Sequence, residues 1–260
     1  MIFLKKLYKP LGLLAIMLFS FYYTERIAIL MQNKSPIMQQ INDVEENYIV
    51  SAVNAKVEDN YIVPGIMGRM VNKNKSYVNM KAFGIFNEYY LIFDDVKPDV
   101  SLEENKDKII KEGNKSKKSV AFLLEDGNET IKKYFKDNKI KADLFITEAT
   151  YDSNSYFEQI NNDKSKYKNV ESLLNKNNQN KNICYIKEMD KENCIKEQKY
   201  LVEETFFLQS DNIVEAKNKI ESGAIILIKK TATLEHLQLL LKETNFKGLS
   251  IVYLSELIKE

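Results

Sequence analysis

The sequence predicts an α/β protein with mainly parallel strands, because two stretches of the chain alternate between strand-like and helix-like patterns. Residues 120–124 form a continuous apolar run, residues 129–138 are helix-like, and residues 142–147 are apolar again. A strand, a helix and a second strand at this spacing form a right-handed βαβ unit whose strands are parallel. The same alternation returns over residues 223–259, which predicts more than one such unit.

The N-terminal part of the chain has the pattern of a membrane anchor. Lys5, Lys6 and Lys9 precede the uncharged, apolar residues 10–24. This stretch is short for a bilayer, which needs about 20 residues, but lysines beside it can extend their charged ends to the membrane surface. No small-residue cleavage site follows, which favours an uncleaved signal anchor over residues 1–26 rather than a cleaved signal peptide.

The position of these lysines also predicts the orientation of the chain. Basic residues before a single span place the N-terminus in the cytoplasm. We therefore expect a single-pass protein of the cell membrane whose remaining residues are extracytoplasmic. The many Lys, Asn and Ile residues suit an AT-rich bacterial genome.

Residues 27–118 have mixed signals and predict a small α+β accessory region followed by a connector. A Pro-Gly turn, a helix over residues 76–83 and a strand over residues 89–93 are the elements expected there. Residues 99–118 are dominated by Lys, Glu and Asn, which is typical of a connector.

The larger domain is predicted to occupy residues 119–260. Besides the first βαβ unit, further strands and helices follow in alternation up to its end. The expected strands are 182–187, 201–207, 223–229 and 248–253, and the expected helices are 212–222, 234–243 and 255–259. Residues 151–181 are polar and Asn-rich, and irregular helix and loop are expected there.

Charge and cysteine content limit the classes of partner. The chain has 38 basic and 37 acidic residues, and Arg26 and Arg69 are its only arginines. Lysines that alternate with acidic residues predict a solvated surface. They do not predict a nucleic-acid site, because such sites favour Arg within a basic patch.

Cys184 and Cys194 are the only cysteines. An exported protein permits a disulfide between them, two buried free thiols are the alternative, and their spacing is not that of a zinc knuckle.

Two segments resemble the NodB-type polysaccharide deacetylases, carbohydrate esterase family 4. Residues 119–147, which contain Leu-Glu-Asp-Gly, are similar to the family's opening motif of a strand, Thr-Phe-Asp-Asp-Gly, a helix and a second strand. Residues 222–257 resemble the closing motif, a Gly-x-Ile-x-Leu strand before a Leu-rich helix and Leu-Ser-Glu-Leu. The resemblance implies a distorted (β/α) barrel. Upstream segments also resemble extracytoplasmic firmicute proteins of this superfamily, so we expect anchor, accessory region and domain to form one complete chain.

The resemblance implies a reaction whose residues are largely missing here. The family removes acetyl groups from carbohydrates with a divalent metal such as zinc, held by one Asp and two His, beside a basic Asp and a catalytic His. By resemblance, Glu125 stands at the base position, Asp126 at the metal-binding Asp and Lys229 at the catalytic His. Residues 148–181 contain no His, and the single His236 is expected on the surface of a helix. We therefore expect no bound metal or other cofactor.

These observations predict a catalytically inactive, deacetylase-like protein at the membrane of a Gram-positive cell. It is expected to bind cell-wall polysaccharide or a protein partner, with Glu125, Asp126 and Lys229 as candidate ligand-binding residues. One alternative is a divergent metal-dependent deacetylase that hydrolyses acetamido C–N bonds with Asp126. In another, Glu125 and Asp126 only cap the following helix, or the domain serves assembly alone.

Overall fold

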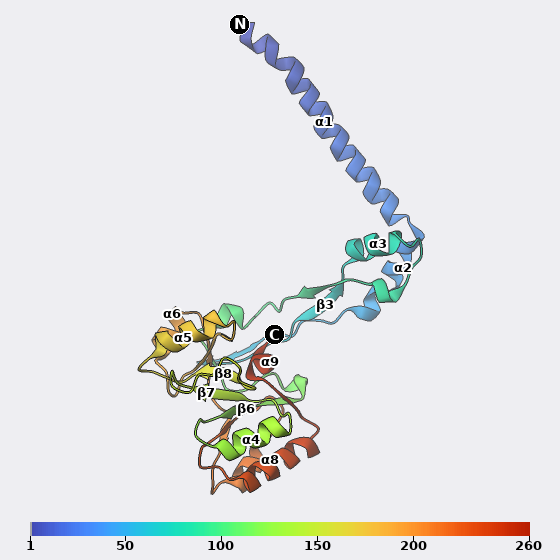
Figure 1. The fold of residues 1–260 in the computed structure, drawn as a ribbon. Helices are drawn as coiled ribbons and strands as arrows, with labels where there is room; N and C mark the ends of the chain where they lie inside the picture. Colours follow the sequence, from blue (N-terminus) through green and yellow to red (C-terminus); the bar gives the residue numbers. More distant parts are fainter. Residues whose placement is uncertain (1) are drawn as a thin grey trace. The chain divides into compact units, whose positions relative to one another are not determined.

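The protein forms two compact units in a computed structural model that describes residues 2–260, with side chains described from residue 12 onward. The smaller unit contains the chain up to Ser51 together with Gly68–Val96 (Figure 1). The larger unit contains Ala52–Met67 and Lys97–Glu260. The chain therefore enters the larger unit, leaves it and returns.

This division differs from the predicted boundaries at residues 26 and 118. Two segments of the predicted accessory region, β2 (Tyr61–Val63) and β5 (Ile109–Ile110), pair with each other, and β5 pairs in parallel with β10 (Tyr200–Val202). The segment around residues 99–118 is therefore part of a sheet of the larger unit and not a connector. Its apolar residues are few, so the sequence pattern did not indicate a strand there.

In the smaller unit, a long apolar helix precedes a small α+β core. Helix α1 spans Ile2–Asn33, and α2 (Pro36–Val44) and α3 (Lys73–Lys81) pack against the antiparallel pair β3 (Gly68–Val71) and β4 (Phe93–Val96). The predicted strand over residues 89–93 is wrong. A 3₁₀ turn forms there instead, because the Asn87 side chain accepts a hydrogen bond from the Tyr89 backbone N–H at 3.0 Å.

Helix α1 is long and apolar enough to cross a membrane. Its segment Gly12–Asn33 has 22 residues, of which none is buried. By length and composition it fits either a membrane anchor or a signal sequence. It extends past Glu25 and Arg26, where the predicted anchor ends.

The larger unit is built from two sheets. One has the order β11-β12-β6-β7-β8, with β13 beside β6, and all its pairings are parallel. Its strands are β6 (Ser119–Leu124), β7 (Asp143–Ile146), β8 (Glu158–Asn161), β11 (Phe206–Leu208), β12 (Ile225–Ile228) and β13 (Ser250–Val252). The second sheet has the order β1-β2-β5-β10-β9 and adds β1 (Lys56–Glu58) and β9 (Ile183–Tyr185). The predicted α/β class with parallel strands is confirmed.

Apolar side chains fill both faces of the parallel sheet. On one face, Phe122 and Phe135 form the centre of a core covered by helices, of which Figure 1 shows α4 and α8 side by side. The helices of this unit are α4 (Glu129–Asp137), α5 (Tyr167–Lys176), α6 (Lys191–Lys196), α7 (Ile213–Lys219), α8 (Leu234–Phe246) and α9 (Leu254–Ile258). On the other face, residues of both sheets, among them Leu123, Leu227 and Val202, form a second core. The space between the two sheets is therefore filled.

Two predictions within this unit are wrong. Residues 201–207 form the ends of two strands in different sheets, β10 and β11, because the chain crosses between the sheets at Glu203, Glu204 and Thr205. Residues 151–181 contain the helix α5, but also the strand β8, where only irregular helix and loop were predicted. The other predicted strands and helices of the domain occur with shifted ends.

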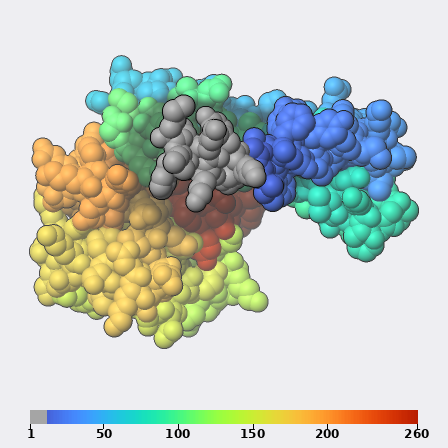
Figure 2. Space-filling view, turned by 90° about the horizontal axis from the view of Figure 1, so that it is seen from above, coloured from blue at the N-terminus to red at the C-terminus, as the bar shows by residue number. Residues whose placement is uncertain are grey.

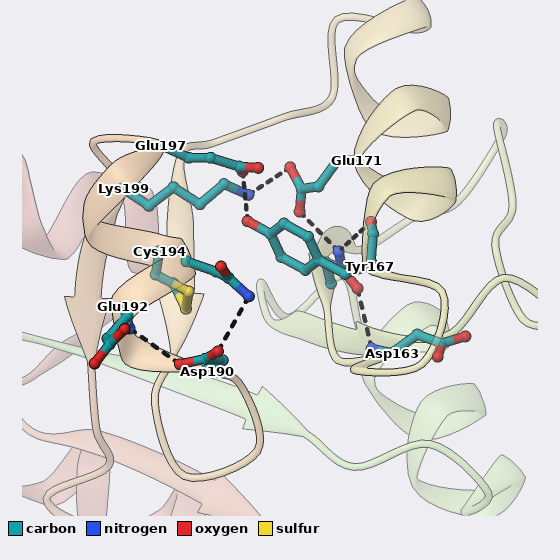
Figure 3. Close-up of a disulfide and its surroundings, with 11 residues drawn as sticks. Asp163, Tyr167, Glu171, Asp190, Glu192, Cys194, Glu197 and Lys199 are labelled. Atoms are coloured by element: carbon teal, nitrogen blue, oxygen red, sulfur yellow. Dashed lines mark hydrogen bonds and ion pairs between the residues drawn. A yellow bond between two sulfur atoms is a disulfide. The ribbon is translucent and has the colours of Figure 1, made fainter.

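The disulfide between Cys184 and Cys194 ties β9 to α6, with the two Cα atoms 6.1 Å apart. Figure 3 shows a polar cluster beside it, in which Lys199 points toward Glu171 and Tyr167 toward Glu197. The Lys199 ammonium and the Glu171 carboxylate form a buried ion pair. The polar, Asn-rich part of the chain is thus held by specific polar contacts.

Asp143, the first residue of β7, is a buried acid with one partner. Its Oδ2 atom accepts a hydrogen bond from the Leu254 backbone N–H at 2.7 Å, whereas Oδ1 has no partner among residues 12–260. Burial raises the pKa of the Asp143 carboxyl well above its usual value and outweighs that hydrogen bond. The folded chain then holds a proton that the unfolded chain releases, so stability falls as the pH rises from about 4 toward the raised pKa.

We expect the substitution Asp143→Asn to flatten this fall in stability, because the amide does not titrate. Urea unfolding at a series of pH values between about 4 and 8 measures it. The control is Asp137→Asn on the exposed end of α4, which should keep the pH dependence of the wild type. An equal pH dependence in the wild type and in Asp143→Asn would show that Asp143 is not the titrating group.

Candidate functional site

The predicted site residues follow two adjacent parallel strands. Strand β6 ends at Leu124 and β12 ends at Ile228, and these two residues are partners in the pairing register. Glu125 and Lys229 come next in the two strands, and the Glu125 N–H donates a hydrogen bond to the Ile228 carbonyl at 3.0 Å. The two side chains therefore leave the same edge of the sheet, where ligand sites of parallel sheets are usually found.

Glu125 and Lys229 form an ion pair. The Lys229 Nζ atom lies 2.7 Å from Glu125 Oε1, and the Lys230 backbone N–H donates to Glu125 Oε2 at 2.8 Å. Both side chains are partly exposed, by 24% for Glu125 and 31% for Lys229. The carboxylate at the base position is thus already engaged by the ammonium at the position of the catalytic His.

Asp126 does not join this pair. Its Oδ1 atom accepts a hydrogen bond from Lys132 Nζ at 2.9 Å, and Lys132 also pairs with Glu129 at 2.5 Å. Burial alone would lower the pKa of Lys132. The hydrogen bonds to Glu129 and Asp126 have the larger combined effect, so the pKa of Lys132 is raised. The structure therefore brings Glu125 and Lys229 together, whereas Asp126 forms an ion pair with Lys132 of α4.

Asn128 connects the loops that follow the two strands. Its Oδ1 accepts from the Ile131 N–H at 3.2 Å and caps α4, while its Nδ2 donates to the Lys230 and Ala232 carbonyls, both at 3.0 Å. The helix cap expected from Glu125 or Asp126 is made by Asn128 instead. Gly127 completes the turn with φ of 98°, which a side chain would strain.

The residues at this site do not fit a divalent metal. The Lys132 ammonium beside Asp126 would repel a cation, and a zinc site needs about three protein ligands. Among the described side chains, no three His, Cys, Asp or Glu residues are grouped to hold a metal ion. His236 lies on α8 and is partly exposed.

A second polar cluster, which the sequence did not indicate, lies at the ends of β9 and β10. The Tyr185 hydroxyl donates to Glu204 Oε2 at 2.7 Å, and Lys187 Nζ lies 2.5 Å from Glu204 Oε1. Burial and the hydrogen bond to Glu204 raise the pKa of Tyr185. The Tyr185 ring packs against Phe145 at 4.6 Å between centroids, so this cluster closes the apolar space between the sheets.

A cavity of about 210 Å³ opens beside this cluster. Its lining includes Lys187, Glu204 and, on β11, the aromatic ring of Phe207. The Lys229 ammonium lies 6.0 Å from the centre of that ring, which makes the cavity a neighbour of the Glu125–Lys229 pair. Glu125, Asp126 and Lys229 do not themselves line this cavity.

Comparison with known proteins identifies the fold. The crystal structure of a wild-type CE4 family pseudoenzyme from Bacillus anthracis aligns with a TM-score of 0.59 at 21% identity, over 86% of this chain and 95% of that chain. This chain has the CE4 fold. A mutant of that pseudoenzyme, described as having restored enzymatic activity, shares the CE4 fold with this chain at a TM-score of 0.57 and 20% identity, over 86% of this chain and 98% of that one.

A sequence relative matches part of this chain. The uncharacterized protein YlxY of Bacillus subtilis is 33% identical over 120 residues. The match covers 44% of this chain and 38% of YlxY, so the chain spans well under half the length of that relative. No protein-family model matches the sequence. The CE4 fold predicted from the two motifs is confirmed by the structural match.

Proposed function

We propose that this chain is a membrane-anchored, non-catalytic, polysaccharide deacetylase-like protein that binds cell-wall carbohydrate outside a Gram-positive cell. The observation that carries the proposal is that ammonium groups neutralise both carboxylates of the ancestral site. Lys229 binds Glu125 at 2.7 Å and Lys132 binds Asp126 at 2.9 Å. A base must be free to accept a proton and a metal-binding carboxylate must be free to coordinate, and neither condition is met.

The structural neighbour supports the loss of catalysis, since a protein with the same fold is described as a pseudoenzyme. Membrane anchoring is supported by α1, whose apolar segment Gly12–Asn33 follows three lysines. Lysines before the span favour an N-terminus in the cytoplasm, so both units beyond α1 would be extracytoplasmic. The disulfide between Cys184 and Cys194 is consistent with that oxidising location.

Carbohydrate is the favoured ligand because of the cavity beside the ancestral site. Carboxylate and ammonium groups on its walls can accept from and donate to sugar hydroxyls, and Phe207 offers an apolar surface to a sugar ring. In that case Glu125 holds Lys229 by their ion pair, and Lys229 in turn would hold the Phe207 ring in place at the wall of the cavity. A protein partner is the other outcome of the test below.

Glycan binding is tested with the full-length chain in lipid nanodiscs, titrated calorimetrically with N-acetylglucosamine oligomers and peptidoglycan fragments. We expect Phe207→Ala to weaken binding by about tenfold, the equivalent of roughly 1.4 kcal/mol. Phe246→Ala is the matched control, because Phe246 is exposed on α8 and does not line the cavity. Equal affinity in the two variants would exclude this cavity, and no glycan binding alongside capture of a protein would exclude carbohydrate as the ligand.

A further inference from the structure

The smaller unit exposes an apolar surface that its own core does not use. Four residues make up this surface, which we call the apolar loop although its first member lies on α3. They are 59% to 95% exposed: Val78, Phe83, Ile85 and Tyr89. The core of the unit, which includes Tyr77 and Met80, is already complete on the other face of α3. Four large apolar side chains this exposed within twelve residues of the chain favour a surface that something else covers.

The apolar loop is held in place and is not a frayed end. The Phe83 ring stacks on the ring of Tyr90, with 4.9 Å between centroids and 7° between planes. The Asn79 side chain donates to the Tyr90 carbonyl at 3.2 Å, which ties α3 to the segment that follows the loop. Gly84, at φ of 69°, allows the sharp turn between Phe83 and Ile85.

Helix α3, which carries Val78 and leads into the apolar loop, contacts the end of the membrane-spanning candidate. Gln32, in the last turn of α1, donates a hydrogen bond from its side chain to Asn74 at the start of α3, at 2.9 Å. Figure 1 shows α3 next to the C-terminal end of α1. In the view from above in Figure 2, the teal segment that contains α3 lies directly next to the blue segment that contains the end of α1.

We infer that the apolar loop inserts into the membrane interface beside the point where α1 leaves the bilayer. Tyr and Phe are favoured at the headgroup level, where one part of the side chain is in an apolar layer and another is hydrated. The lipid surface is the occupant the structure favours, because α1 and α3 belong to the same compact unit and contact each other through Gln32 and Asn74, and the apolar loop is formed by α3 and the segment after it. This inference rests on the anchoring part of the proposed function.

Single tryptophans test the inference directly, because the natural chain contains none. Phe83→Trp reports on the apolar loop, Phe246→Trp is the matched control on exposed α8, and Leu18→Trp reports on the anchor. Full-length protein is placed in nanodiscs of ordinary or brominated phosphatidylcholine, and iodide serves as a quencher from the aqueous side. We expect bromine to quench Leu18→Trp and Phe83→Trp, and iodide to quench only Phe246→Trp strongly.

Three other results would overturn the inference in distinguishable ways. If Leu18→Trp is quenched by bromine but Phe83→Trp is not, the anchor stands and the loop lies in water. If Leu18→Trp is not quenched, the anchor fails and the inference with it. If Phe83→Trp is shielded from iodide without being quenched by bromine, a second protein surface covers the loop instead of lipid. Val78→Trp, on the exposed face of α3, gives a second reporter should Phe83→Trp disturb the stack with Tyr90.

Discussion

Replacing Lys199 by Met is expected to lower the free energy of unfolding by about 3–5 kcal/mol. Its side chain is 4% exposed and forms an ion pair with Glu171, which is 9% exposed. Without the ammonium, Glu171 would remain as a buried charge held only by the amide groups of Asn161 and Asn180, at 2.8 and 2.9 Å. An uncompensated buried carboxylate is among the most destabilising changes a core can undergo.

Lys229→Met is the matched control, since Lys229 forms an ion pair with Glu125 of which both members are partly exposed. Solvent screens that pair, and its loss should cost about 1 kcal/mol or less. Urea denaturation of both variants gives the comparison. Adding Glu171→Gln to Lys199→Met should recover part of the loss, and equal effects of Lys199→Met and Lys229→Met would contradict the buried ion pair.

Removing the disulfide has the second largest expected effect. The double substitution Cys184→Ala and Cys194→Ala should lower the free energy of unfolding by about 2–3 kcal/mol, because the cross-link closes a short loop, with a sequence separation of 10, in the unfolded chain. Both cysteines are buried, so part of the loss also reflects packing between β9 and α6.

A reductant provides the internal control for this prediction. Unfolding in its presence should bring the wild type close to the double variant and leave the double variant unchanged. A wild type whose unfolding does not respond to the reductant would show that the cross-link contributes nothing to stability. Native mass spectrometry confirms the state of the cysteines in each sample.

The sequence predicted the parts of the fold in which local pattern and burial agree. Strand β6 and strand β12 are buried throughout, so their continuous apolar runs identified them. Strand β8 was missed because Gln159 and Asn161 are buried in it, and their amides donate to the Asp152 carbonyl and to Glu171, seven and ten residues away. The sequence pattern does not show that these polar side chains are paired and buried, so it indicates no strand there.

The crossing between the sheets was missed for a related reason. Apolar side chains lie on both sides of Glu203 and Glu204, and a single strand is the simplest interpretation of such a run. In the structure Lys187 pairs with both acids, with Glu204 at 2.5 Å and with Glu203 at 3.3 Å, and Lys111 pairs with Glu203 at 3.5 Å. These ion pairs join segments that are separated in sequence, so the local pattern did not reveal them.

At the site, the meeting of Glu125 and Lys229 follows from the parallel pairing of β6 and β12, which the structure shows and the sequence pattern did not specify. The direction of the Asp126 side chain does not follow from the pattern, since it depends on Lys132 one turn into α4. The resemblance identified which positions had changed. The structure adds that the lysine at the His position neutralises Glu125 and that Lys132 of α4 neutralises Asp126.

The measurement that tests the proposed loss of catalysis most directly is acetate release from N-acetylglucosamine oligomers by the full-length chain in nanodiscs. The assay is run with zinc, cobalt or nickel in turn, and bound metal is quantified in the same samples. Because Lys229 and Lys132 occupy the carboxylates of the ancestral site, we predict no acetate above the blank and no stoichiometric metal. Acetate release that requires metal and disappears in Asp126→Ala would contradict the proposal.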